Sequence, residues 1–208
     1  MKKIYLVRHG QSEGNIGPIR QSPESPLTET GQKQASLLAE RLSHLEFELL
    51  ISSPFKRAYQ TAEIISSKTG KQIIKNNLFI ERKRPSKQIN QPKDSEDNIQ
   101  SEIKYNQAFK EDKKYKDGES FVEITQRARD ALSFLDEKTN KSTVVVTHGI
   151  FLRVICAIVL LKESVTAENC FEMIKTLKTA NTGITVIEKD EYDEWHLITW
   201  NDHAHFAE

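Results

Sequence analysis

The sequence predicts an α/β protein, a three-layer α/β/α sandwich with a mostly parallel central sheet and an excursion over the candidate site. Short β-branched runs alternate with longer helical patterns, which is typical of parallel strands joined by crossover helices. The chain has 208 residues, enough to bury the interior of one sizeable domain. Residues 82–117 are polar and show no clear period. We therefore expect one domain, residues 1–208, with residues 82–117 as a polar insertion or lid.

The predicted strands are short apolar runs: Ile4–Val7, Leu49–Ser52, Gln72–Leu78, Thr143–Thr147, Gly183–Glu188 and Trp195–Trp200. A first helix starts near Thr28, a plausible cap. A second opens at Ser53 as N-cap, with Pro54 in the first turn, where its missing N–H costs nothing. Apolar residues at helical spacing follow Glu119, and Phe151–Leu161 is apolar enough to form a buried helix.

Composition excludes several classes of partner. The formal net charge is zero, so nothing favours binding to nucleic acid or to an anionic membrane. The apolar run Ile4–Val7 is too short for a secretory signal, and no segment approaches the length of a membrane span. We expect a soluble cytoplasmic protein. Cys156 and Cys170 show no metal-like spacing and are expected to be buried free thiols.

Three polar segments follow predicted strands or open predicted helices. They are Arg8-His9-Gly10, the helix start that carries Arg57, and His148-Gly149. In open parallel sheets ligands bind beyond the carboxyl ends of the strands, so these residues are expected to converge. Guanidinium groups and helix N-termini suit phosphate oxygens, and a neutral imidazole can attack phosphorus. Each feature alone is more often structural, but together they favour phosphoryl chemistry.

The segments "LVRHGQSEGN", "SSPFKRAYQTA", "THGIFLR", "NTGITVIE" and "NDHAHF" resemble the histidine phosphatase superfamily, the phosphoglycerate mutase-like proteins. The resemblance implies an α/β/α domain and a phosphohistidine intermediate formed without a metal or other cofactor. It also implies a small-molecule phosphomonoester as the partner.

Carried over by position, the resemblance makes His9 the nucleophile and Glu81 the acid and base. It places Arg8, Arg57 and His148 in the phosphate pocket, adds Asn15 as a donor, and matches Ser12 and Thr28 less firmly. Should Glu81 not be the acid, Glu13 or Glu119 would be the next candidates.

The resemblance leaves the fate of the phosphohistidine open. The stretch "ERKRPSKQINQP" after Glu81 departs from the mutase pattern "RHYG", which favours a phosphomonoester hydrolase. The alternatives are a phosphoglycerate mutase-type phosphotransferase, a phosphoprotein phosphatase and a non-catalytic phosphate-binding relative.

Two further groups of residues stand out. The basic run after Glu81 is either a solvated loop or a contact for a second anionic group of the substrate; its members are Arg82, Lys83, Arg84 and Lys87. His203 and His205 could chelate a metal, but two ligands make no complete site, so we interpret them as structural.

Overall fold

The computed structural model describes residues 1–138 and 140–206, which form strands and helices in alternation over most of the chain. The strands are β1 (Lys2–Arg8), β2 (Leu49–Ser52), β3 (Ile73–Lys75), β4 (Ser142–Thr147), β5 (Ile184–Lys189) and β6 (Trp195–Asp202). The α-helices are α1 (Glu13–Ile16), α2 (Glu29–Ser43), α3 (Lys56–Thr69), α4 (Glu96–Lys110), α5 (Phe121–Glu137), α6 (Gly149–Leu161) and α7 (Ala167–Thr176).

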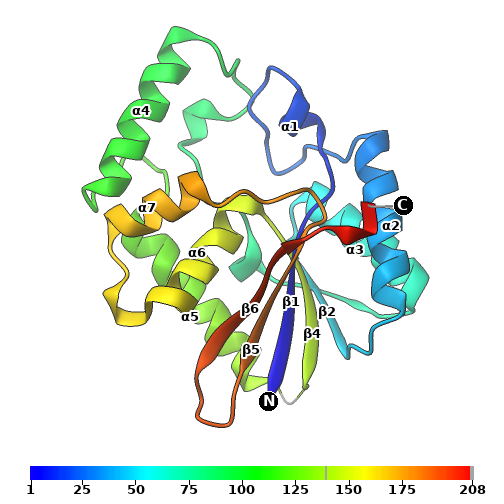
Figure 1. Ribbon diagram of the computed structural model, residues 1–208. Helices are drawn as coiled ribbons and strands as arrows, with labels where there is room; N and C mark the ends of the chain where they lie inside the picture. The colour runs from blue at the N-terminus through cyan, green and yellow to red at the C-terminus, as the bar shows by residue number, and fades with distance from the viewer. Residues whose placement is uncertain (139, 207–208) are drawn as a thin grey trace.

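One mostly parallel sheet organises the fold. Its strand order is β3-β2-β4-β1-β5-β6. The first four of these strands pair in parallel, and β5 pairs antiparallel with both β1 and β6. Helices α2 and α3 cover one face of the sheet, and α5 and α6 cover the other (Figure 1). The predicted three-layer α/β/α architecture is confirmed.

The sheet buries side chains on both faces, which is why its central strands are nearly continuous apolar runs. Ile4 and Leu6 of β1 pack on one face with side chains of α5 and α6. Val7 of β1, together with Val144 and Val146 of β4, packs on the other face with side chains of α2 and α3. Since successive strand residues point to opposite faces, each strand is locked between two apolar layers. Its end is therefore a rigid support for whatever follows it.

Two predicted boundaries were wrong. The strand expected over Gln72–Leu78 is confined to β3, because the Asn76 side chain accepts a hydrogen bond from the Leu78 amide at 2.9 Å and caps a 3₁₀ turn. The helix expected to open at Ser53 begins at α3, with Phe55 as its N-cap residue. The carbonyl of Phe55 accepts the first helical hydrogen bonds.

Other local predictions were confirmed. The Thr28 hydroxyl accepts a hydrogen bond from the Gly31 amide at 3.0 Å and caps α2. Cys156 and Cys170 are buried free thiols. Among the described residues no helix is both long enough and apolar enough to cross a membrane.

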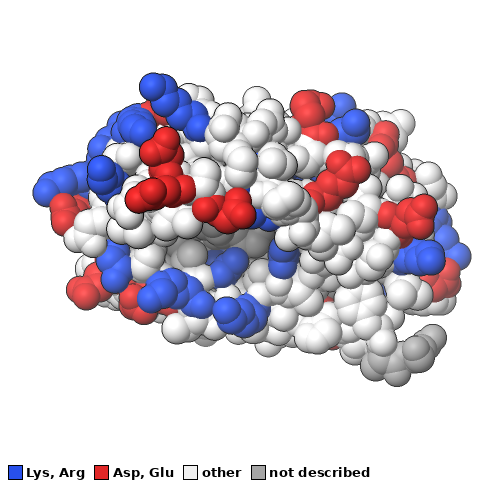
Figure 2. All heavy atoms as spheres, turned by 90° about the horizontal axis from the view of Figure 1, so that it is seen from above, with Lys and Arg blue, Asp and Glu red and all other residues white. Residues whose placement is uncertain are grey.

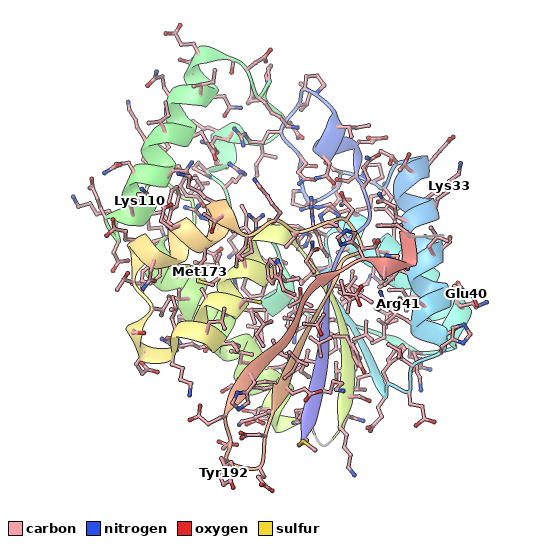
Figure 3. All side chains as sticks on the ribbon, viewed as in Figure 1. Lys33, Glu40, Arg41, Lys110, Met173 and Tyr192 are labelled. Atoms are coloured by element: carbon pink, nitrogen blue, oxygen red, sulfur yellow. The ribbon has the colours of Figure 1, made fainter. Side chains whose placement is uncertain are left out.

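The polar insertion (residues 82–117) carries α4. This helix rests on α7: the rings of Phe109 and Phe171 lie 6.1 Å apart, and Lys110 Nζ lies 3.4 Å from Glu172 Oε1. Figure 3 shows Lys110 at the end of α4 beside the helix that carries Met173. The insertion is also joined to the loop after α1, where Arg20 exchanges backbone hydrogen bonds with Asn90 and Gln91.

Candidate active site

The three polar segments predicted to converge lie at one edge of the sheet. In the β1–β4 ladder Arg8 pairs with Thr147, so His9 and His148 leave neighbouring strands at the same level. The strand β2 ends at Ser52, directly before the turn that leads into α3. Figure 2 looks down on this edge and shows a hollow at its centre, with Lys and Arg atoms inside it and on its rim.

His9 lies at the centre of this edge and is 2% exposed. Its Nδ1 lies 2.6 Å from the carbonyl oxygen of Gly10, and its Nε2 lies 3.2 Å from Nε of Arg57, which donates to it. The carbonyl can only accept, so Nδ1 carries the proton and Nε2 carries the lone pair. The geometry therefore fixes both the ring and its tautomer.

The surroundings of His9 keep its imidazole neutral. Burial lowers the pKa of His9 well below its usual 6.5, and the nearby charges of Arg57 and Arg8 lower it further, while the hydrogen bond to Gly10 opposes them. A neutral imidazole is the form that can act as a nucleophile.

The turn after His9 lies very close to the backbone of α2. A Cβ atom on Gly10 would lie 2.5 Å from the carbonyl oxygen of Gly31 in α2. The Gly10 amide in turn donates to the hydroxyl of Thr61 in α3, at 3.1 Å. Glycine at this position lets the turn sit against both helices.

Two guanidinium groups flank His9. Arg57 is 2% exposed and donates from Nη1 to the carbonyl of Ser22 at 3.0 Å. Burial lowers the pKa of Arg57 to about 10; the Glu81 carboxylate opposes this shift and Arg8 adds to it. Burial also lowers the pKa of Arg8, whose Nη1 donates to the carbonyl of Thr179. The Nε of Arg8 has no hydrogen-bond partner among the described residues.

His148 lies beside His9, with the ring centroids 5.1 Å apart and the rings in an edge-to-face arrangement. Its Nε2 lies 2.8 Å from the Ser53 hydroxyl, so the side chain predicted to cap α3 instead orients this imidazole. Burial lowers the pKa of His148 well below 6.5, with the Arg57 charge as the next cause. Within the described part of the chain its Nδ1 has no partner.

Glu81 approaches the same edge from the loop after β3. Its carboxylate accepts backbone hydrogen bonds from Ile150 (3.2 Å) and Phe151 (3.0 Å), at the N-terminus of α6, and from Arg82 (2.9 Å). It is close enough to Arg8 and Arg57 to favour their charged forms. The structure therefore brings Glu81 together with the residues around His9.

Asn15 is joined to the site through Asn181, a residue for which the sequence predicted no role. The Asn181 amide donates to the carbonyl oxygen of His9 at 2.9 Å and lies 3.4 Å from Asn15 Oδ1. That oxygen also accepts from the Ser12 amide at 3.0 Å. With Oδ1 occupied, the NH₂ group of Asn15 is the part that can donate to a ligand.

The remaining candidates from the sequence are Thr28, Ser12, Glu13 and Glu119. The hydroxyl of Thr28 caps α2 and lies 2.9 Å from Gln11 Oε1. The buried Ser12 hydroxyl contacts Asn15. Glu13 is exposed, and the Glu119 carboxylate is buried in an ion pair with Arg127. No described hydrogen bond joins any of these side chains to His9.

The basic run after Glu81 divides into separate roles. Arg82 is 5% exposed, with its guanidinium 3.8 Å from the ring centroid of Tyr105. Arg84 forms an ion pair with Glu102. Lys87 lines a groove on the insertion itself. Arg82 therefore lies inside the insertion and not in a solvated loop.

The two late histidines have no described hydrogen bond to the side chains of His9 or His148. His205 Nε2 lies 3.0 Å from the hydroxyl of Thr182, and His203 is exposed. Across residues 1–138 and 140–206 there is no group of His, Cys, Asp and Glu side chains that could hold a metal ion.

Two arginines beside a neutral imidazole, Arg57 buried and Arg8 partly buried, define the class of site. Two guanidinium groups lie near His9, and Nε of Arg8 and Nδ1 of His148 have no hydrogen-bond partner among the described residues. Such a set matches the oxygens of a phosphoryl group, and His9 offers a lone pair beside them. The fold and the site are those of an α/β enzyme that handles phosphoryl groups.

Comparison with known proteins gives this class a name. The model of the histidine phosphatase superfamily (branch 1) matches residues 4–203, so the chain belongs to that superfamily and is a phosphatase-family enzyme. The resemblance inferred from the sequence motifs is confirmed.

Individual relatives carry different names. A protein of Escherichia fergusonii described as a probable phosphoglycerate mutase is 31% identical over 157 residues, which cover 73% of this chain and 72% of the relative. The phosphoserine phosphatase 1 of Hydrogenobacter thermophilus is 42% identical over 82 residues, 39% of each chain, so the match spans well under half of that relative. The structure of YhfR from Bacillus stearothermophilus superposes with a TM-score of 0.82, at 26% identity and 99% coverage of both chains.

We expect the two buried imidazoles to make folding sensitive to acid. The native pKa values of His9 and His148 lie well below 6.5, so the unfolded chain binds protons that the native state does not. As pH falls below 6.5, each should therefore lower the free energy of unfolding by about 1.4 kcal/mol per pH unit until its native pKa is reached. Urea denaturation at pH 7, 6 and 5 measures this slope.

In the same titration His148→Gln should show a shallower slope than the parent, since one imidazole is gone. The exposed His44 provides the matched control, and His44→Gln should keep the parent slope. Equal slopes for His148→Gln and the parent would contradict the assignment.

Proposed function

We propose that the protein hydrolyses phosphomonoesters through a phosphohistidine intermediate on His9, with Glu81 as acid and base. The observation that carries this proposal is the fixed tautomer of His9. The hydrogen bond from Nδ1 to the Gly10 carbonyl leaves the lone pair on Nε2, next to the Arg57 guanidinium. A substrate phosphoryl group that takes over the Arg57 N–H donors would release this lone pair for attack.

The reaction has two displacements. In the first, a bond forms between His9 Nε2 and phosphorus, the bond from phosphorus to the leaving oxygen breaks, and Glu81 gives that oxygen its proton. In the second, water attacks phosphorus, its proton passes to Glu81, and the electron pair of the nitrogen–phosphorus bond returns to Nε2. Each displacement leaves Glu81 ready for the next.

Positive charge in the site would stabilise the transferring group. Arg57 is buried and Arg8 is partly buried, and both guanidinium groups are held by hydrogen bonds to backbone carbonyls, so little reorganisation is needed when negative charge develops on the phosphoryl oxygens. His148, in the tautomer that accepts from the Ser53 hydroxyl at Nε2 and carries its proton on Nδ1, and the amide of Asn15 would add further donors.

Hydrolysis is favoured over phosphotransfer by the segment after Glu81. The first residue of that segment, Arg82, is buried between aromatic rings of the insertion, so its guanidinium is not available to hold a second substrate over His9. The phosphatase name of one relative supports hydrolysis, while the mutase name of another keeps phosphoglycerate mutase activity as the second candidate.

The substrate we propose is a small metabolite with a second anionic group. Arg20 and Arg84 share the single carboxylate of Glu102, and Lys93 lies near both arginines. Three cations around one carboxylate leave an excess of positive charge where the insertion meets the loop after α1. The polar insertion would act as a lid that places these cations over a bound phosphomonoester.

His9→Ala should abolish hydrolysis of p-nitrophenyl phosphate, by about 10³-fold or more, because the nucleophile is lost. It should also prevent acid-labile labelling of the protein by a ³²P-labelled phosphomonoester. Turnover by this variant at the parent rate would refute the mechanism. Including 3-phosphoglycerate and 2,3-bisphosphoglycerate as substrates distinguishes the two candidates, since a phosphorylated product formed without free phosphate would establish a mutase.

Arg84→Gln should raise KM for doubly anionic substrates by about 10-fold or more, because a charged hydrogen bond is worth about 1.5–3 kcal/mol. It should change KM for p-nitrophenyl phosphate by less than about two-fold. Lys87→Gln is the matched control from the same basic run and should change neither value. Equal effects of Arg84→Gln on both substrate types would count against a second anionic group.

A further inference from the structure

One buried ion pair holds the loop that carries Glu81. Arg127 of α5 donates from Nε to Glu119 Oε1 and from Nη2 to Glu119 Oε2, both at 2.8 Å. The two side chains are only 12% and 5% exposed. A planar guanidinium bound to both oxygens of a carboxylate allows one relative orientation, so this pair is rigid as well as buried.

The Arg127 side of the pair fixes the chain before Glu81. Its Nη1 donates to the carbonyl of Leu78 at 2.8 Å and to the carbonyl of Ile80 at 2.9 Å. The guanidinium also lies 4.1 Å from the ring centroid of Phe151, whose amide donates to Glu81. Arg127 thus contacts both the chain that leads to the carboxylate and the helix start that binds it.

The Glu119 side fixes the chain after Glu81. Glu119 Oε2 accepts from the Lys83 amide at 3.1 Å, and the Glu119 amide donates to the Lys83 carbonyl at 2.8 Å. The hydroxyl of Tyr105 donates to that carbonyl as well, at 2.7 Å. Glu81 is therefore held between two restrained segments, and neither partner of the ion pair is among the described hydrogen-bond partners of its carboxylate.

We propose that the Glu119–Arg127 ion pair positions Glu81 for proton transfer to the leaving oxygen. Both are positioning residues, since they act on Glu81 through the backbone. This inference rests on the proposed role of Glu81. It assigns to Glu119, which the sequence suggested as an alternative acid, a different task in the same reaction.

A misplaced acid changes the reaction rate in a way that a general loss of protein stability does not. A strongly basic leaving oxygen departs only when it is protonated, whereas p-nitrophenolate departs readily without a proton. A displaced Glu81 should therefore slow the reaction more as the leaving group becomes more basic. The leaving oxygen departs in the first displacement, which kcat/KM reports, whereas the second displacement, with Glu81 as base, is the same for every substrate. The loss that depends on the leaving group should therefore appear in kcat/KM, while phosphate binding by the arginines around His9 should change little.

The test uses the full-length protein and a series of substituted phenyl phosphates. Arg127→Lys keeps the positive charge but loses the planar fork, and Glu119→Gln keeps the shape of the side chain but loses its charge. Each should leave kcat/KM for p-nitrophenyl phosphate within about three-fold and lower kcat/KM for phenyl phosphate by about 10-fold or more. The inhibition constant of inorganic phosphate, which reports phosphate binding, should stay within about two-fold. Two variants are made so that a failure of one to fold leaves the other to decide.

A matched control comes from the opposite layer. Arg41 of α2, labelled in Figure 3, also forms a two-point ion pair, with Asp202. Arg41→Lys should leave the dependence on the leaving group as in the parent. A uniform loss of kcat/KM over the series in Arg127→Lys and Glu119→Gln, or no loss, would overturn the positioning role.

Glu81→Gln separates this inference from the proposed function. It should show the same dependence on the leaving group, more strongly than either positioning variant. If Glu81→Gln itself shows no such dependence, the acid role of Glu81 fails. If it does and the ion-pair variants do not, only the positioning role fails.

Discussion

The parallel register of β1 and β4 is the constraint on which the site depends. Arg8 pairs with Thr147, and the His9 amide donates to the Thr147 carbonyl at 3.0 Å, so the two imidazoles emerge side by side. A slip by one residue would turn every side chain of β1 to the other face of the sheet. That would disrupt the packing of both apolar layers and move His9 away from Arg57. The packing of the two cores therefore fixes the geometry of the chemistry.

The site holds positive charge at a cost in stability. Burial disfavours the charged forms of Arg8 and Arg57, and each guanidinium is partly compensated by a backbone carbonyl, from Thr179 and Ser22 respectively. Glu81 is the carboxylate that favours both charges, and it is shared between them. An incoming phosphoryl group would restore the balance, which is how a site can bind an anion tightly with few contacts.

Features set by neighbouring residues, such as strand ends and helix caps, can be predicted from the sequence. Features set by contacts between distant parts of the chain cannot. The ends of β1, β2 and β4 were predictable because apolar runs stop where the polar segments begin, and the Thr28 cap because its signal lies within one turn of the helix. The N-cap at Ser53 was wrong because the hydroxyl contacts His148, 95 residues away along the chain. Glu119 lies before α5, eight residues from Arg127, and nothing local reveals that their ion pair restrains the chain around residue 81.

The polar insertion contacts both the cations proposed to recognise the substrate and the chain next to the proposed acid. Tyr105 and Phe109 of α4 enclose the guanidinium of Arg82, and the Arg82 amide donates to the Glu81 carboxylate. The neighbouring residue Arg84 belongs to the cation cluster at the loop after α1. A movement of α4 would therefore shift the groups proposed to recognise the substrate and the chain next to the acid together. Helix α4 packs against helix α7, which is not part of the sheet. Such a movement would therefore not require β1 or the ring of His9 to shift.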